Sequence, residues 1–258
     1  MNKQLFTLLA GTILSAFLTG CALTETKQIE NLSDLKGLTV AVPRGTTHEA
    51  YMAGHTEADV RSFDSTMEAI SALQLGRASA AVTNRAVATV AVRQDSTLFI
   101  VPLEMGKDPV AVAVGKGNVA LRDSISKIIL SLKKEGILDG MEARWLSAPE
   151  AYFPLAIDYP AEGTPLRVAV SANREPFCFK DASGTICGFD AELAGRIARS
   201  LNRPLVFVDM NFSALVTSLQ AGRVDAIISL MNFTPERERV VDFTVPYFES
   251  ERVMLQKK

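Results

Sequence analysis

Two short segments of this sequence combine the residue types and spacing needed to hold a small carboxylate. Arg237 follows Thr234-Pro235-Glu236 at an expected helix start, and a guanidinium can bind a carboxylate through two parallel hydrogen bonds. Gly45-Thr46-Thr47 ends one strand pattern and opens a helix, where free N–H groups and a hydroxyl favour an anion. The simpler interpretations are a solvated surface arginine and a plain helix N-cap.

The elements that must position these segments occur twice in the chain. Residues 71–81 (SALQLGRASAA) match residues 217–227 (TSLQAGRVDAI), and each copy predicts a helix, a Gly C-cap and a short strand. Further strands are expected at 38–43, 60–63, 166–170 and 205–208, with a helix over 189–201. Strands that alternate with helices predict two α/β lobes, and ligands bind at the carboxyl ends of such strands.

The second copy carries an ordered set of motifs that resembles a known family. They are Glu175-Pro176-Phe177, Gly188-Phe189-Asp190, Phe212-Ser213-Ala214-Leu215, Gly222-Arg223-Val224-Asp225-Ala226, Thr234-Pro235-Glu236-Arg237 and Val241-Asp242-Phe243. Residues 166–258 resemble the first lobe of type II periplasmic solute-binding proteins, family 3, in the branch that mostly binds polar amino acids. Residues 35–146 resemble the rest of that fold. The resemblance implies an α/β protein with two lobes and an interlobe cleft.

The order of the lobes differs from the order usual in the family, which runs first lobe, second lobe and back. Here residues 34–106 are expected to form the second lobe and 107–258 the first, with 147–165 joining the usual ends. That linker contains four prolines and a glycine, as expected of a surface connection. A circular permutation is favoured, because 253–258 looks like the strand that leads into 34–37. The alternative is a fragment of a longer tandem protein.

The resemblance also assigns ligand contacts to individual residues. It makes Arg237 the clamp for a ligand carboxylate, with Thr46 and Thr47 facing it from the other lobe. Phe212 matches an aromatic that packs on the ligand; alone it would be read as core. Ser229 and Asn232 lie on a loop that contacts the ligand amino group, where bulk at Leu230 narrows the pocket.

Two departures from the family pattern change the expected ligand. Arg174 stands where an aromatic is common, and Asn84 stands where an Asp pairs with the ligand ammonium. An amide keeps hydrogen bonds but loses the neutralising charge. An ordinary amino acid, an acidic amino acid, a dicarboxylate and another small anion therefore all stay open. His48 is a candidate pH-dependent contact or a surface residue.

The start of the chain has the pattern of an export signal. Lys3 precedes an apolar run that is too short to span a membrane, and Leu18-Thr19-Gly20-Cys21 resembles a lipobox. We expect residues 1–20 to be a signal peptide, Cys21 to be lipidated and 21–33 to form a tether. The expected location is the cell envelope, with a lipid anchor in a membrane.

Export affects the interpretation of the remaining cysteines. Cys178 and Cys187 flank a turn signal and are expected to face each other in a hairpin, where an oxidising compartment allows a disulfide. The alternative is two reduced, buried thiols.

Composition excludes some classes of function. The chain of 258 residues has 27 basic and 29 acidic residues, which argues against nucleic-acid binding. Two His and three Cys leave little material for a metal site, and no cofactor is expected. The favoured function is a monomer that delivers a ligand to the permease of an ABC importer. A ligand-sensing accessory domain is the alternative, and an enzyme resembling cyclohexadienyl dehydratase is less favoured.

Overall fold

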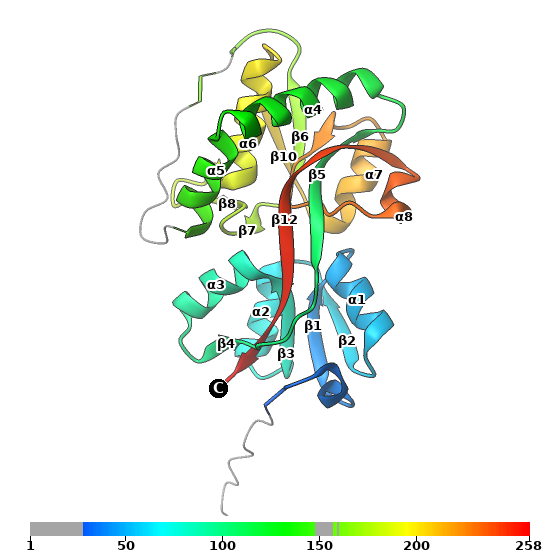
Figure 1. Ribbon diagram of the computed structural model, residues 1–258, viewed down its shortest axis with the longest axis vertical. Coiled ribbons are helices and arrows are strands. Elements are labelled where there is room, and N and C mark those ends of the chain that lie inside the picture. Colours follow the sequence, from blue (N-terminus) through cyan, green and yellow to red (C-terminus); the bar gives the residue numbers. More distant parts are fainter. Residues whose placement is uncertain (1–27, 148–156, 159) are drawn as a thin grey trace, which may run out of the picture.

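Two α/β lobes are joined by long strands in the computed structural model, which describes residues 28–147, 157–158 and 160–258 (Figure 1). The expected signal peptide, Cys21 and part of the 147–165 linker lie outside the described residues. Within those three ranges, no helix has both the length and the apolar composition needed to cross a membrane.

The N-terminal lobe contains a parallel sheet with helices packed around it. After a 3₁₀ turn, η1 (Leu32–Leu35), its elements are β1 (Thr39–Pro43), α1 (Thr47–His55), β2 (Asp59–Phe63), α2 (Thr66–Gln74), β3 (Ala80–Asn84), α3 (Arg85–Gln94) and β4 (Leu98–Ile100). Strand β1 pairs in parallel with both β2 and β3. The carboxyl ends of β1 and β3 therefore lie at one edge, which faces the other lobe (Figure 1).

The C-terminal lobe begins with β5 (Lys107–Gly115), α4 (Val119–Lys134), α5 (Ile137–Glu142) and a π-helical turn, η2 (Ala143–Ser147). It continues with β6 (Leu166–Val170), β7 (Asn173–Arg174), β8 (Cys178–Lys180), β9 (Ile186–Cys187), α6 (Phe189–Ser200), β10 (Leu205–Asp209), η3 (Phe212–Ala214), α7 (Leu215–Gln220), β11 (Ala226–Ile227) and α8 (Pro235–Glu238). Strand β6 pairs in parallel with β10 and β11. Their carboxyl ends face the N-terminal lobe.

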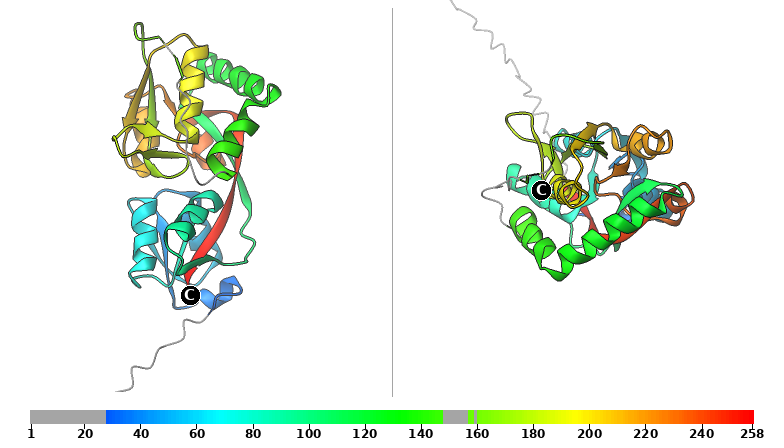
Figure 2. Two further views of the ribbon diagram at one scale, coloured as in Figure 1. Left: turned by 90° about the vertical axis from the view of Figure 1, so that its left-hand side faces the viewer. Right: turned by 90° about the horizontal axis from the view of Figure 1, so that it is seen from above.

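The last strand, β12 (Val241–Lys257), runs through both lobes (Figure 2). It pairs antiparallel with β5 from Val241 to Glu251 and then with β3 and β4. The two lobes therefore share one sheet in the order β10-β6-β11-β5-β12-β3-β1-β2. Of β12, the sequence predicted only the last part, the strand at 253–258.

The repeated helix–turn–strand unit has the predicted glycine caps. Gly76 follows α2 with φ +68°, and Gly222 follows α7 with φ +67°. Each glycine N–H donates to the carbonyl three residues earlier, at Leu73 and Leu219. The left-handed conformation explains why the same residue type occupies both positions.

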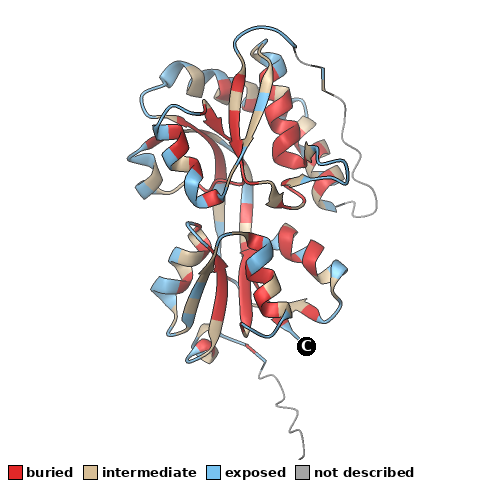
Figure 3. Cartoon of the chain, turned by 180° about the vertical axis from the view of Figure 1, so that it is seen from behind, coloured by how far each residue is buried: buried red, intermediate tan, exposed pale blue. Residues whose placement is uncertain are grey.

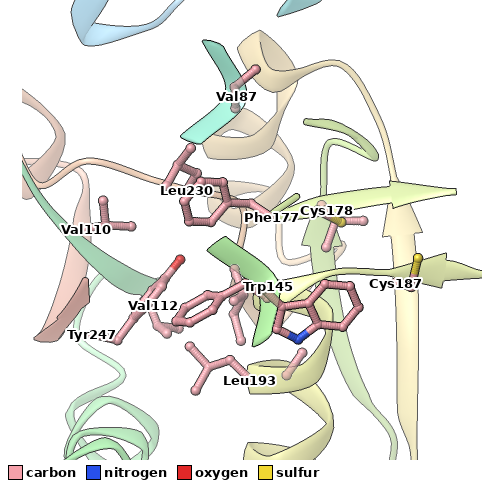
Figure 4. Close-up of a cluster of buried hydrophobic side chains, with 14 of the residues drawn as sticks. Val87, Val110, Val112, Trp145, Phe177, Cys178, Cys187, Leu193, Leu230 and Tyr247 are labelled. Atoms are coloured by element: carbon pink, nitrogen blue, oxygen red, sulfur yellow. The ribbon is translucent and has the colours of Figure 1, made fainter. Parts of the chain in front are cut away.

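Buried side chains line the strands of both lobes (Figure 3). One continuous apolar cluster includes Val87 of α3 and Phe177, Leu193 and Tyr247 of the C-terminal lobe (Figure 4). The lobes are thus in apolar contact as well as joined by strands.

The predicted pairing of Cys178 with Cys187 is wrong by one residue. In the β8–β9 ladder, Cys187 is opposite Phe179, and Cys178 is opposite Arg174 on β7. A one-residue offset moves a side chain to the other face of a sheet. Both cysteines are accordingly free, buried thiols, and burial raises the pKa of each one.

Candidate ligand site between the lobes

Arg237 spans the gap between the lobes from helix α8. Thr234 caps this helix by accepting from the Arg237 N–H at 3.2 Å. The Arg237 guanidinium donates through Nη1 to the Asn232 carbonyl at 2.7 Å and through Nη2 to the Gly45 carbonyl at 2.8 Å. Burial lowers its pKa to about 10, so it is a cation at neutral pH. Arg237 therefore closes the lobes onto each other.

The start of α1 meets Arg237 from the N-terminal lobe. Thr46 is the N-cap: its hydroxyl donates to the Pro43 carbonyl at 2.7 Å and accepts from the Glu49 N–H. Gly45 has φ +73°, and a Cβ there would lie 3.3 Å from the Ser213 Cα of the other lobe. A glycine is thus required for the lobes to approach this closely.

Thr47 links α1 to both the hinge and the C-terminal lobe. Its hydroxyl oxygen is 3.0 Å from Asp108 Oδ2 and 3.2 Å from Asn232 Oδ1. Asp108 on β5 also accepts from Arg252 on β12, whose Nη1 donates to the Met105 carbonyl at 2.7 Å. The Arg252 guanidinium carbon lies 4.3 Å over the Tyr51 ring. An ion pair between the hinge strands therefore anchors the helix that carries Thr47.

Arg174 and Phe212 form the centre of the site. Arg174 at the end of β7 is only 4% exposed, and its guanidinium carbon lies 4.0 Å over the Phe212 ring. The Arg237 guanidinium carbon is 5.5 Å from the same ring centroid. Burial, and then the charge of Arg237, lowers the pKa of Arg174 to about 10. Among the described residues, the Arg174 guanidinium has no hydrogen-bond or ion-pair partner.

Asp190, at the start of α6, is a buried acidic residue whose charge interacts with that of Arg174. Its carboxylate accepts from the Tyr247 hydroxyl at 2.8 Å and from the Leu230 N–H at 2.6 Å. Burial raises its pKa to about 7, although the Arg174 charge acts in the opposite direction. Asp190 thereby fixes the loop after β11. Leu230 on that loop has φ +48° and lies beside Val87 and Phe177 (Figure 4).

His48 and Asn84 form a neutral chain in the N-terminal lobe. His48 Nε2 is 3.3 Å from Asn84 Oδ1, and Asn84 Nδ2 donates to the Ser250 hydroxyl on β12. Burial lowers the pKa of His48 to about 3, with further lowering by the charges of Arg252, Arg174 and Arg237. His48 is therefore an uncharged, buried residue rather than a surface one.

Several buried polar atoms around these strand ends lack a hydrogen-bond partner among the described residues. They are His48 Nδ1, Thr83 Oγ1, Ser171 Oγ, Asn173 Oδ1, Asn232 Nδ2 and Arg252 Nε. A buried polar group without a partner costs about 1–3 kcal/mol.

Two of the candidate residues, Ser229 and Thr46, already make structural hydrogen bonds within the protein. Ser229 accepts from the Ser171 N–H at 2.9 Å and so joins β11 to β6, while Thr46 serves as a cap. Beside Asn84 and Ser250 a pocket of about 260 Å³ opens, lined also by Lys107, Phe177, Phe248 and Glu251. Both lobes contribute to its lining, but Asn84 is the one candidate site residue in it.

Sequence reasoning missed Asp108, Arg252, Ser171 and Ser250. Asp108 lies on β5, and Arg252 and Ser250 lie on β12. The sequence did not predict the full length of either strand. The position of Ser171 directly after a predicted strand was the signal available. In the described part of the chain, no three His, Cys, Asp or Glu side chains are grouped as a metal site would require.

The C-terminal segment matches a family of known proteins. Residues 166–258 match the model for bacterial extracellular solute-binding proteins, family 3. The probable histidine-binding protein of Campylobacter jejuni is 40% identical over 93 residues, which is 36% of this chain and 36% of that protein. The ABC transporter arginine-binding protein 1 of Escherichia coli is 38% identical over 93 residues, 36% of this chain and 38% of that protein.

Solved structures give similar matches. The arginine-bound domain 1 of TmArgBP is 42% identical, with a TM-score of 0.32 over 36% of this chain and 79% of that one. An ancestral arginine-binding protein bound to arginine is 42% identical, with a TM-score of 0.33 over 33% of this chain and 38% of that one. The chain spans little more than a third of the curated relatives it matches. Residues 166–258 of this chain therefore carry the sequence pattern of the bacterial extracellular solute-binding proteins of family 3.

Proposed function

We propose that this chain captures a small amino acid or carboxylate between its lobes and delivers it to an ABC importer. The observation that carries the proposal is the pair of guanidinium groups on the Phe212 ring, that of the buried Arg174 and that of the half-buried Arg237. A guanidinium is the side chain best suited to hold a carboxylate in fixed orientation. The unpartnered buried atoms around the pair supply further bonds.

Closure of the lobes is the signal that a permease would recognise. The Arg237–Gly45 hydrogen bond and the Thr47–Asn232 contact both cross between lobes, and they exist only when the lobes are closed. Hinge closure around a ligand is a common way to report occupancy. The names of the relatives, which include an ABC transporter arginine-binding protein, support the same role.

Export and anchoring complete the proposal. Cys21 would be acylated after removal of residues 1–20, which would hold a monomer at the surface of a membrane in the cell envelope. The lobes would be related to the usual order by circular permutation. In support, the Ile29 N–H donates to Gln256 Oε1 at 3.1 Å, so the start of the N-terminal lobe lies beside the end of β12.

Replacing Arg237 by Met tests the proposed function. Removal of a charge-assisted, bidentate contact costs about 2–3 kcal/mol, so R237M should lower carboxylate affinity by about 30-fold or more. Isothermal titration with acetate, aspartate, glutamate, arginine and succinate measures it. R239M is the matched control, because Arg239 is an exposed arginine two residues away. If R237M and R239M bind the captured ligand equally well, the carboxylate clamp is wrong.

Turnover separates capture from catalysis. A binding protein releases its ligand unchanged, so incubation of the bound compound with excess protein should leave its mass and its NMR spectrum unaltered. Conversion of the compound would replace the transport proposal with an enzymatic one.

A further inference from the structure

We infer that the interlobe site takes a small organic dianion that has no ammonium group, with one carboxylate at Arg174 and the other at Arg237. This inference rests on the proposed capture of a small carboxylate, and it specifies the charge and chemical class of that ligand. Three features of the site support it. Among the described residues, the buried Arg174 guanidinium has no hydrogen-bond partner. The nearby carboxylates already accept hydrogen bonds from the protein, and the neutral Asn84 amide is also hydrogen-bonded.

Arg174 is the unused cation. It is 96% buried, being only 4% exposed, and among the described residues nothing accepts a hydrogen bond from its guanidinium. The Phe212 ring covers one face of the group at 4.0 Å, which leaves the N–H edge as the bonding surface. Asp190 interacts with this charge at a distance, but a buried charge that lacks a hydrogen-bonded counterion is strongly unfavourable. An anionic group placed against that edge would remove the penalty.

Arg237 supplies the second anion position. Its guanidinium shares the Phe212 ring with Arg174, at 5.5 Å from the centroid. In the closed form its N–H groups donate to two backbone carbonyls, those of Asn232 and Gly45. These two bonds use only part of the guanidinium, so its remaining N–H groups can donate to a ligand carboxylate. A short dicarboxylate has the two charges needed for both arginines.

The carboxylates nearby are already used by the protein. Asp108 accepts from Arg252 and lies against the Thr47 hydroxyl. Asp190 accepts from the Tyr247 hydroxyl and the Leu230 N–H. Each of these two carboxylates therefore already accepts two hydrogen bonds from the protein. An α-ammonium placed between Arg174 and Arg237 would meet like charge, which is unfavourable where the arginines are shielded from water.

Asn84 does not replace the missing carboxylate. Its amide oxygen pairs with His48 Nε2, and its amide nitrogen donates to the Ser250 hydroxyl. The amide is therefore committed on both sides and carries no charge. Burial lowers the pKa of His48, and the charges of Arg252, Arg174 and Arg237 lower it further, so three cations act on this wall of the site.

Paired ligands of equal length test the inference. The full chain is titrated at pH 7 with succinate against aspartate, and with glutarate against glutamate, with arginine and butyrate as further probes. Each pair differs by one ammonium group. We expect each dicarboxylate to bind about tenfold or more tightly than its amino-acid partner. Tighter binding of aspartate, glutamate or arginine overturns the inference and leaves carboxylate capture standing. Failure of every carboxylate to bind removes the proposed function as well.

Variants of Arg174 test the second anion position. R174M should weaken succinate binding by about tenfold or more while butyrate binding changes little, because butyrate needs only Arg237. R239M is the matched control and should retain both affinities. R174Q is the second variant if R174M does not fold, as judged by far-UV circular dichroism. Equal losses for succinate and butyrate would show that Arg174 only supports the fold, and would overturn the inference.

Discussion

The two lobes contribute unlike chemistry to the site between them. The C-terminal lobe supplies charge, through Arg174 and Arg237 around Phe212. The N-terminal lobe supplies the start of α1, where the Glu49 carboxylate already accepts from the Gly45 N–H, and the neutral His48–Asn84 pair. The same helix–turn–strand unit is present in both lobes. The difference therefore comes from the residues at the strand ends, and it shows that one fold unit can carry either role.

The largest expected effect uses one titratable group from each lobe. His48 has a pKa of about 3 when folded and Asp190 a pKa of about 7, both because of burial. The unfolded chain binds the extra proton at His48 between about pH 3 and 6.5, so this group makes stability rise with pH. The folded chain binds the extra proton at Asp190 between about pH 4 and 7, so that group makes stability fall with pH.

H48Q and D190N separate these opposite contributions. We expect the stability advantage of the wild type over H48Q to grow from pH 4 to 7, and its advantage over D190N to shrink, each by a few kcal/mol (order of magnitude). Urea unfolding across that range measures both. H55Q, at an exposed histidine of the same helix, controls for loss of an imidazole. Parallel pH profiles for H48Q and D190N would contradict the assignment.

The second prediction concerns a negative charge introduced into the N-terminal lobe. N84D introduces a carboxylate beside His48, on the wall where the charges of Arg252, Arg174 and Arg237 act, which should favour a ligand ammonium. Aspartate should gain on succinate by about tenfold relative to the wild type, as measured by titration calorimetry. N202D is the matched control at an exposed asparagine. An unchanged aspartate-to-succinate ratio would mean that Asn84 does not set ligand charge.

The smallest expected effect concerns the glycine turn that occurs once in each lobe. Nothing lies within 4 Å of a Cβ built on Gly76 or Gly222, so an alanine there bears only the cost of the left-handed backbone. G76A and G222A should each lower stability by about 1–2 kcal/mol. G54A, inside α1, should instead be neutral or stabilising. Thermal unfolding of G76A and G222A measures the two losses of stability. A marked difference between them would show that the two turns are not equivalent.

Local patterns of the sequence allowed much of the fold to be predicted. The strand at 166–170 matches β6, and the glycine caps at 76 and 222 have the expected left-handed backbone. Helix termini and apolar runs are short-range signals, so they can be read without the tertiary structure. The Cys178–Cys187 pairing failed because ladder register depends on partners outside the hairpin, here Arg174 on β7.

The chemical types at the site were also visible in the sequence. Arg237, Arg174, Asn84 and His48 stand near strand or helix ends, and the family resemblance in residues 166–258 identified the lobe that carries the two arginines. The sequence could not show which of these side chains already form hydrogen bonds within the protein. Whether Asn84 is free or already bonded depends on Ser250, which lies 166 positions away in the chain.

By itself, the sequence determined the α/β class, the repeated unit, the family and the candidate carboxylate-binding residues, because each depends on local residue type and spacing. Only the tertiary structure decided that β12 joins both lobes, that Asp108 is paired with Arg252, and that Arg174 is buried without a partner. These features arise from contacts between residues distant in sequence. Burial and pairing, which together set the charge of the site, exist only once those residues have been brought together.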